Sequence, residues 1–255
     1  MIKAVFFDVD GTLLSHKTKS VPDSARRAIN KLQEKGIQCV VATGRHKQFL
    51  DMLPVKDIDF DFYILLTGQL GMDRQGNAVA GCPLKGIGKE KVVQMFQNKT
   101  IPMMFLEKDT TYANFVDAAV EKAHKAVSTP VPSVGEYIGG DIYQAIAYVD
   151  EKVTLAELED CCKLTRWSDF AVDIIAKEGG KVAGIQVFLE KYGISREETM
   201  AFGDGENDME MLEFVQVGVA MGNAEGCVKE IADYVTASVD DDGIEKALID
   251  LGLLA

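Results

Sequence analysis

The sequence predicts an α/β protein in which both ends of the chain build one parallel sheet and the middle forms an inserted α+β domain. Short apolar runs alternate with amphipathic segments near both ends, and this alternation is typical of parallel strands joined by right-handed crossovers. The alternation stops in residues 83–177 and then returns. Acidic and glycine-rich motifs follow predicted strands in both flanking parts, as expected at the ligand-binding edge of one shared sheet. The predicted domains are therefore residues 1–82 with 178–255, and residues 83–177.

The first part of the chain predicts three buried strands separated by two helices. Each strand is an apolar run bounded by glycine or by polar turn residues, and the first helix is entered through Pro22 and ended by Gly36. The strands are expected at residues 2–7, 37–42 and 62–66, and the helices at residues 24–35 and 46–53. A turn-rich stretch at residues 73–77 then predicts a β-hairpin.

Residues 83–177 show a different pattern, which predicts a mixed α+β fold. Phe170, Val172 and Ile174 occupy alternate positions, which predicts a half-buried strand of an antiparallel sheet at residues 170–175. The other elements expected here are helices at residues 89–97 and 153–162 and strands at Met103–Leu106 and residues 145–149.

The α/β alternation returns after residue 178 and is expected to extend the same parallel sheet. Helices are expected at Lys181–Tyr192 and at residues 208–213, 225–231 and 243–251, and strands at residues 200–202 and 215–220.

Composition restricts the class of partner. The formal net charge of −13 argues against nucleic acid or an anionic membrane, but is compatible with a small anionic substrate whose site holds a metal or a lysine. No basic leader and no apolar run of membrane-spanning length is evident in the sequence. Five cysteines without a C-x-x-C pair favour reduced thiols and a cytoplasmic location. The oligomeric state is not predicted.

Four polar motifs are expected at the carboxyl edge of the predicted parallel sheet, where open α/β sheets bind ligands. Three follow strands and one precedes a helix: Asp8-Val9-Asp10-Gly11-Thr12, Thr43-Gly44-Arg45, Gly203-Asp204-Gly205-Glu206-Asn207-Asp208 and Gly179-Gly180-Lys181. Together they supply two pairs of carboxylates, a hydroxyl, a lysine and backbone N–H groups.

Asp8 and Asp10 raise an electrostatic problem that a cation would solve. Side chains two positions apart in a strand lie on one face about 6–7 Å apart. Two carboxylates at ~6 Å repel by roughly 3 kcal/mol at an effective dielectric constant of about 20, unless water, a shared proton or a cation offsets the repulsion. Clustered carboxylate oxygens suit Mg²⁺, whereas the cysteines and histidines lack zinc-ligand spacing. With Thr43 and Lys181 to hold an anion, these residues favour phosphoryl transfer to an aspartate nucleophile.

The motifs D-V-D-G-T-L, T-G-R, G-G-K and G-D-G-E-N-D, in this order, resemble the four motifs of the haloacid dehalogenase (HAD) superfamily of phosphatases. The insertion between the second and third motifs and the segment at residues 217–248 resemble those of Cof-type sugar phosphatases of subclass IIB. The resemblance implies a Rossmann-like parallel-sheet HAD core with an inserted α+β cap of type IIB. It also implies a Mg²⁺-dependent phosphatase that acts on a small phosphorylated metabolite, most simply a sugar phosphate.

The resemblance further implies a role for each site residue. Asp8 would be the nucleophile that forms an aspartyl-phosphate, and Asp10 the general acid and base. Mg²⁺ would be held by the Asp8 carboxylate, the Asp10 backbone carbonyl and Asp204, with Asp208 orienting its waters. The transferring phosphoryl group would be held by Thr43, Gly44, Lys181 and Asn207.

Several features leave the identity of the substrate open. The family's Asn-Gly-Ala turn after the third strand is replaced here by residues 67–69, Thr-Gly-Gln, which affects substrate recognition more than chemistry. Arg45 suits either a surface position or a substrate contact, and Trp167 either a stacking surface for a sugar or a hairpin. Discrimination between substrates is expected to come from loops of the cap.

Two other functions are compatible with the sequence. A phosphomutase or phosphotransferase would use the same aspartyl-phosphate, and a non-catalytic sugar-phosphate-binding regulator would use the same fold. A regulator would normally lack the nucleophile or a metal ligand, and neither is lost here. Dinucleotide binding is excluded because Gly86-x-Gly88 lacks a third glycine, and a P-loop because Gly180-Lys181 is followed by valine.

Overall fold

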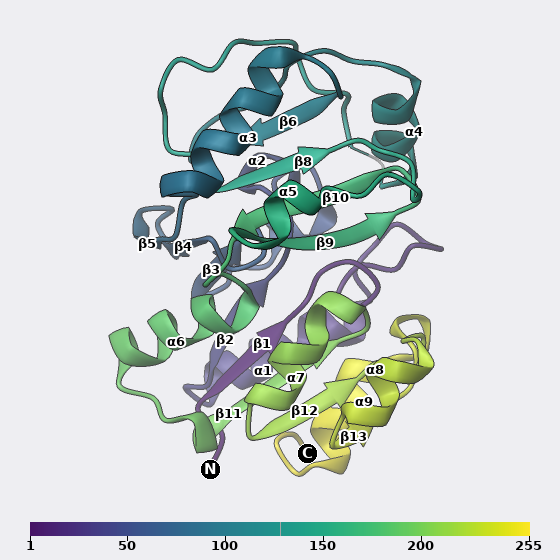
Figure 1. Cartoon of the computed structure of the whole chain (residues 1–255). Helices are drawn as coiled ribbons and strands as arrows, with labels where there is room; N and C mark the ends of the chain where they lie inside the picture. The colour runs from purple at the N-terminus through teal and green to yellow at the C-terminus, as the bar shows by residue number, and fades with distance from the viewer. Residues whose placement is uncertain (128) are drawn as a thin grey trace. The chain divides into compact units, whose positions relative to one another are not determined.

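The computed structural model describes residues 1–127 and 129–255, which divide into two compact units (Figure 1). The core unit comprises Met1–Ala80 and Lys181–Ala255, and the inserted unit comprises Gly81–Gly180. The two ends of the chain therefore fold together, and the inserted unit is one continuous segment. In the part of the chain that the structure describes, no helix has the length and apolar character needed to cross a bilayer.

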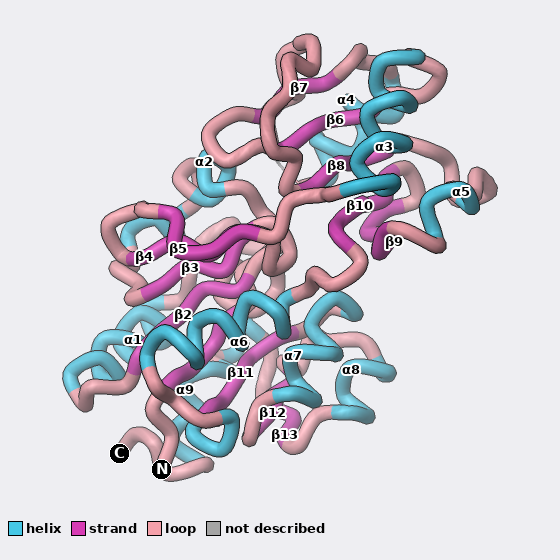
Figure 2. The backbone as a smooth tube through the Cα atoms, turned by 60° about the vertical axis from the view of Figure 1, so that its left-hand side comes forward, coloured by secondary structure: helices cyan, strands magenta, loops and turns pink. Residues whose placement is uncertain are grey.

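The core unit is built on an eight-stranded sheet with the strand order β13-β12-β11-β1-β2-β3-β4-β5, whose strands lie side by side in Figure 2. The neighbouring pairs from β13 to β3 are parallel, and β4 runs antiparallel to β3. The strands are β1 Ala4–Phe7, β2 Gln38–Ala42, β3 Phe62–Leu65, β4 Leu70–Asp73, β5 Ala78–Gly81, β11 Thr199–Gly203, β12 Val217–Ala220 and β13 Tyr234–Val235. This arrangement confirms the predicted α/β class, and it places β1 between strands from opposite ends of the chain.

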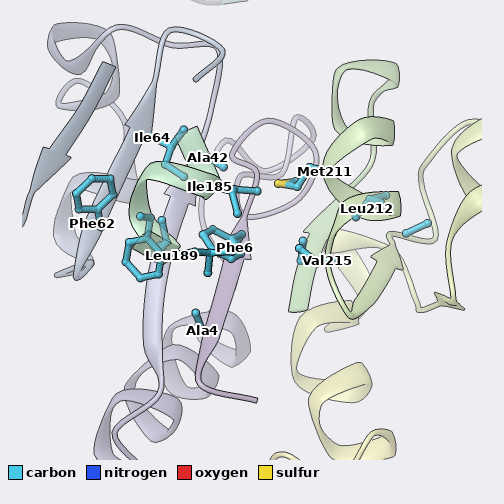
Figure 3. Close-up of a cluster of buried hydrophobic side chains, with 14 of the residues drawn as sticks. Ala4, Phe6, Ala42, Phe62, Ile64, Ile185, Leu189, Met211, Leu212 and Val215 are labelled. Carbon is cyan, nitrogen blue, oxygen red and sulfur yellow. The ribbon is translucent and has the colours of Figure 1, made fainter. Parts of the chain in front are cut away.

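Helices cover both faces of the core sheet. Ile185, Phe188 and Leu189 lie on one side of α6, as an amphipathic helix requires, and pack with α7 and α8 on the face that carries Phe6 (Figure 3). On the opposite face the thiol of Cys39 contacts a carbonyl oxygen of α1. The helices are α1 Asp23–Glu34, α2 Lys47–Leu50, α6 Lys181–Tyr192, α7 Met209–Phe214, α8 Gly226–Ile231 and α9 Gly243–Asp250, with 3-10 turns η1 Pro54–Asp57, η2 Arg196–Glu198, η3 Glu206–Asp208 and η4 Val239–Asp241.

The inserted unit is an α+β fold on a five-stranded antiparallel sheet with the order β7-β6-β8-β10-β9. Its core includes Phe96 of α3 stacked on Phe105 of β6, with ring centroids 4.0 Å apart. The elements are α3 Gly86–Asn98, β6 Met103–Leu106, β7 Thr111–Ala113, α4 Ala118–Ala126, β8 Gln144–Ala147, α5 Ala156–Glu159, β9 Cys162–Ser168 and β10 Ala171–Ala176.

Two predictions for the inserted unit are wrong. The helix expected at residues 153–162 is limited to α5, because Cys162 already pairs with Ala176 in the β9–β10 hairpin. The strand β10 is not half-buried: Ala171 and Ile175 are as buried as Ile174, which points to the other face. β10 lies inside the sheet between β8 and β9, and both of its faces are covered.

Candidate active site

The site is formed where β1, β2 and β11 end side by side. The backbone N–H of Asp8 donates to the carbonyl oxygen of Phe202 at 3.0 Å, and that of Thr43 donates to Ile64 at 2.9 Å. The parallel pairing thus continues for one residue beyond β1 and β2 before each chain segment turns. The polar motifs that follow these strands are brought together because the strands are neighbours in the sheet.

Lys181, the first residue of α6, joins two of the predicted acidic residues. Its Nζ donates to Asp8 Oδ1 at 2.6 Å and to Asp208 Oδ1 at 2.5 Å. All three residues are buried: Asp208 is 0%, Lys181 2% and Asp8 5% exposed. Lysine is almost never buried to this degree unless it is paired, so the two carboxylates and the ammonium form one unit.

Asp208 uses both carboxylate oxygens within the protein. Oδ1 accepts from Lys181, and Oδ2 accepts from the backbone N–H groups of Asp204 and Gly205 at 3.0 Å each. Asp208 therefore fixes the turn that carries Asp204 and at the same time holds Lys181. These contacts suit a residue that holds other site residues in place. They are compatible with the expectation that Asp208 orients the water molecules of the metal.

Asp204 is held by two residues whose roles the sequence did not reveal. Thr12 Oγ1 donates to Asp204 Oδ1 at 2.8 Å, and Asn223 Nδ2 donates to Oδ2 at 3.2 Å. Asn223 also donates to the carbonyl oxygen of Gly11 at 2.8 Å. Thr12 and Asn223 lie in the DVDGT motif and the C-terminal segment that carry the family resemblance, but only the fold shows that they meet at one carboxylate.

Glycine is needed at position 11 because the Asp204 carboxylate lies against its backbone. Its φ of +84° lies in the left-handed region, and a Cβ at this position would lie 2.0 Å from Asp204 Oδ2. Any side chain would therefore displace the Asp204 carboxylate. The turn at Gly11 uses the carbonyl oxygens of Val9 and Leu14, which leaves the carbonyl oxygen of Asp10 outside its hydrogen bonds.

The site carries more negative charge than its lysine offsets. Burial and repulsion from Asp208 raise the pKa of Asp8 well above its ordinary value, although Lys181 opposes this. Burial and Asp208 also raise the pKa of Asp204 to about 7. Burial lowers the pKa of Lys181, but Asp208 and Asp8 more than offset this, so its net pKa is raised. The lysine is thus held as an ammonium among carboxylates that are costly to ionise without a further cation.

The donor set fits a hard divalent cation. Carboxylate oxygens of Asp8, Asp204 and Asp208 lie within 4.8 Å of one another. Lys181 supplies one positive charge against three carboxylates, so Mg²⁺ would bring the charges close to balance. Mg²⁺ accepts oxygen ligands and is usually bound through one or two protein carboxylates, a demand that Asp8 and Asp204 meet.

Asp10, the other acidic residue of the first motif, pairs with Arg45. Arg45 Nε donates to Asp10 Oδ2 at 2.6 Å and Nη2 donates to Oδ1 at 2.7 Å. The hydroxyl of Thr43 accepts from the backbone N–H of Arg45 at 3.1 Å, within the turn that also contains Gly44. Arg45 is therefore not a surface residue: its side chain is 11% exposed and its guanidinium binds a carboxylate inside the site, while the substrate contact stays a prediction.

Two further residues selected from the sequence are Asn207 and Trp167. Asn207 directly precedes Asp208 and is exposed, and among the described residues no hydrogen bond joins it to Asp8 or Lys181, so its role in phosphate binding stays a prediction. Trp167 lies in the β9–β10 hairpin and donates its indole N–H to Asp173 at 2.8 Å, which fits the hairpin alternative.

The turn at residues 67–69, where the chain departs from the family pattern, has an unusual backbone. Leu66 and Thr67 both have left-handed φ angles, of 53° and 55°, and Gly68 follows with 88°. The N–H of Thr67 donates to the carbonyl oxygen of Thr43 at 3.0 Å, so this turn is joined to the predicted phosphate-binding turn. The Gln69 side chain is fully buried, and its Oε1 has no hydrogen-bond partner among the described residues.

The fold and the site define a class: an α/β enzyme with an acidic, lysine-bridged site at the carboxyl edge of a parallel sheet. The particular family follows from the sequence, which matches the haloacid dehalogenase-like hydrolases over residues 5–248. The chain therefore belongs to this family.

Relatives and solved structures agree with this assignment. The "Putative phosphatase YkrA" of Bacillus subtilis (strain 168) is 33% identical over 258 residues, which cover 99% of this chain and 98% of the relative. The structure of BT1666, a HAD phosphatase from Bacteroides thetaiotaomicron, matches with a TM-score of 0.89 and 31% identity, covering 100% of this chain and 96% of that one. The HAD subclass IIB sugar phosphatase BT4131 matches with a TM-score of 0.87 and 31% identity, covering 99% of this chain and 100% of that one. These findings confirm the predicted family, its core with an inserted α+β cap, and the prediction of a phosphatase.

Proposed function

We propose that this chain is a Mg²⁺-dependent phosphatase that hydrolyses a sugar phosphate or a similar small phosphorylated metabolite through an aspartyl-phosphate on Asp8. The observation that carries the proposal is the buried contact of Lys181 with Asp8 and Asp208, at 2.6 and 2.5 Å. A carboxylate held by an ammonium at the edge of a parallel sheet is suited to attack a phosphoryl group, because the same ammonium stabilises the charge on the transferring oxygens.

In the first step, an oxygen of Asp8 attacks phosphorus and the bond between phosphorus and the leaving oxygen breaks. Asp8 Oδ1 is held by Lys181, which leaves Oδ2 without a hydrogen bond among the described residues and available for attack. Asp10 gives its proton to the leaving oxygen, so the alcohol departs neutral. The phosphoryl oxygens are held during transfer by Thr43, Gly44, Lys181 and Asn207.

In the second step, Asp10 takes a proton from a water molecule, and the hydroxide attacks phosphorus. The bond from phosphorus to Asp8 breaks, and inorganic phosphate leaves with Asp8 restored. A residue that gives a proton in one half of a reaction and takes one in the other needs access to solvent, and the Asp10 side chain is 31% exposed.

Mg²⁺ would be held by the Asp8 carboxylate, the Asp10 backbone carbonyl and Asp204, and would supply positive charge that neutralises the phosphate and polarises phosphorus for attack. Asp208 would orient the water molecules bound to the ion. The proposal that the substrate is a sugar phosphate draws support from the similarity to the sugar phosphatase BT4131. A cytoplasmic location is also proposed, supported by cysteines that are all free.

The experiment that tests the proposal is phosphate release from a panel of phosphorylated metabolites, with and without Mg²⁺, by the wild type and Asp8→Asn. We expect release that requires Mg²⁺ and is lost in Asp8→Asn. The uncatalysed reaction is among the slowest known, with enzymatic accelerations up to ~10²¹, so background cannot imitate a positive result. Phosphoryl movement between sugar positions without release would instead identify a mutase, and neither activity would identify a binding protein.

A further inference from the structure

We propose that Arg45 is a positioning residue: it fixes the carboxylate of Asp10 in the orientation that proton transfer to the leaving oxygen requires. This inference rests on the proposed function, since it assigns a role within that reaction. It is carried by contacts inside the core unit.

The contact between the two side chains is a fork. Nε and Nη2 of Arg45 donate to different oxygens of Asp10, at 2.6 and 2.7 Å. Two parallel hydrogen bonds between planar groups fix the rotation of the carboxylate as well as its position, which a single contact would not do. The Arg45 side chain is 11% exposed, so solvent competes only weakly for its donors.

Asp10 needs such a partner because its surroundings fix only its backbone. The turn after β1 is closed by hydrogen bonds from Gly11 to Leu14 at 2.9 Å and from Leu14 to Val9 at 2.7 Å. These bonds leave the side-chain torsions of Asp10 free. Among the described residues, Arg45 is the one hydrogen-bond partner that the structure gives this carboxylate.

Arg45 is itself held in place by its backbone. Its N–H donates to the hydroxyl of Thr43 at 3.1 Å, and its carbonyl oxygen accepts from Leu66 at 3.3 Å. The turn that presents the predicted phosphate-binding hydroxyl therefore also presents the guanidinium. The position of the proton-transferring carboxylate is in this way tied to the position of the phosphate-binding turn.

The alternative role is a direct contact between Arg45 and the substrate. The fork to Asp10 uses two of the five N–H donors of the guanidinium, so a substrate contact would have to use the others. A substrate-binding role and a positioning role differ in one measurable way. In the first step, a group that acts through Asp10 matters only when the leaving oxygen needs a proton.

The test compares two substrates, a primary alkyl phosphate such as a hexose 6-phosphate and p-nitrophenyl phosphate, whose leaving group departs without a proton. The variants are Arg45→Lys, which keeps the charge but loses the fork, and Arg45→Gln. The matched control is Arg27→Gln, an exposed arginine whose ion pair with Glu245 is 3.5 Å long. General acid–base catalysis contributes ~10²–10⁴-fold, so we expect kcat on the alkyl phosphate to fall by ~10–100-fold in both Arg45 variants. On p-nitrophenyl phosphate we expect the pre-steady-state burst of p-nitrophenol, which reports the first step alone, to be as fast as in the control.

A double variant completes the test. In the Asp10→Asn background, Arg45→Lys should cause no further loss on the alkyl phosphate, because its effect passes through Asp10. A p-nitrophenol burst slowed as much as turnover of the alkyl phosphate, a rise in KM with unchanged kcat, or additive losses in the double variant would each overturn the positioning role. A wild type that releases no phosphate from either substrate in Mg²⁺ would instead overturn the proposed function, and the inference with it.

Discussion

The Nζ of Lys181 lies 2.6 Å from Oδ1 of Asp8, although the two residues are 173 positions apart in the sequence. Both side chains are buried, so neither charge has solvent to stabilise it. Breaking a buried pair by removing one partner leaves the other charge uncompensated, at a cost of about 3–5 kcal/mol.

We therefore expect Lys181→Met to lower the free energy of unfolding by about 3–5 kcal/mol in urea denaturation. Phosphatase activity should fall by ~10²-fold or more, because the transferring oxygens lose an electrostatic partner. Lys191→Met, an exposed position on the same helix, is the matched control and should change neither quantity appreciably. Equal stability of the two variants would contradict the structural importance of the Lys181 contacts.

Gly11→Ala should abolish Mg²⁺ binding as measured by calorimetric titration. The new methyl group would lie within 2.0 Å of Asp204 Oδ2, and the carboxylate must move. The comparison is Gly36→Ala, where φ is also positive at +77° but no atom lies within 4 Å of the added Cβ. That variant carries the backbone strain of the left-handed region without the clash, so it should lose stability while it retains Mg²⁺ affinity. Similar Mg²⁺ affinities in the two variants would show that Asp204 is not needed for binding.

Thr12→Val and Asn223→Ala should each weaken Mg²⁺ binding by ~10–100-fold, the range found when groups behind metal ligands are removed. Both residues donate to the carboxylate of Asp204, at 2.8 and 3.2 Å, and fix its orientation. Thr12→Ser keeps the hydroxyl and should restore most of the affinity. If Thr12→Ser binds Mg²⁺ as weakly as Thr12→Val does, the hydroxyl of Thr12 is not the group that supports Mg²⁺ binding.

The single tryptophan should report the protonation of Asp173. Burial raises the pKa of Asp173 to about 7, against hydrogen bonds from Trp167 and Gln144 that lower it. Since the Trp167 indole N–H donates to this carboxylate at 2.8 Å, the emission of Trp167 should titrate with a midpoint near the same pH. Asp173→Asn should remove the transition, and Asp169→Asn, in the exposed turn of the same hairpin, should not.

The same group predicts a pH dependence of stability. The native state keeps a proton on Asp173 up to about pH 7, whereas the unfolded chain releases it near the ordinary aspartate pKa. Because the native state binds more protons in this window, its stability should fall as the pH rises from about 4 to about 7. Melting temperatures of wild type and Asp173→Asn should therefore diverge across this range, and parallel curves would contradict the assignment.

Much of the core unit could be predicted from local pattern alone. The helix α6 begins and ends at the predicted residues, since Gly180 and Gly193, both with positive φ, bound it. Buried parallel strands read as continuous apolar runs, which made β1 and β2 recognisable. The helix α4 was overlooked even though Asp117 caps it, with its carboxylate accepting from the N–H groups of Ala119 and Val120.

The parts of the site that were not predicted depend on contacts between residues far apart in the sequence, which no local sequence pattern contains. Arg45 meets Asp10 because β1 and β2 are neighbours, and Asn223 reaches Gly11 across 212 positions of sequence. The motifs indicate which residues are expected to do the chemistry, but not that Thr12, Asn223 and Arg45 contact two of them, Asp204 and Asp10. Their roles become visible only when the register of the sheet is known.

The position of β1 between β2 and β11 has a consequence for biosynthesis. Among the strands of the core sheet, β1 is made before the others and lies inside the sheet, and its neighbour β11 is made only after the whole inserted unit. Until then the nascent chain carries an apolar strand with one unpaired edge, and the carboxylate of Asp8 lacks the ammonium of Lys181. Such a chain should depend on chaperone protection during synthesis. In a circular permutant that begins at the inserted unit, the two segments that build the core sheet would be made one directly after the other. Such a permutant should depend less on chaperone protection.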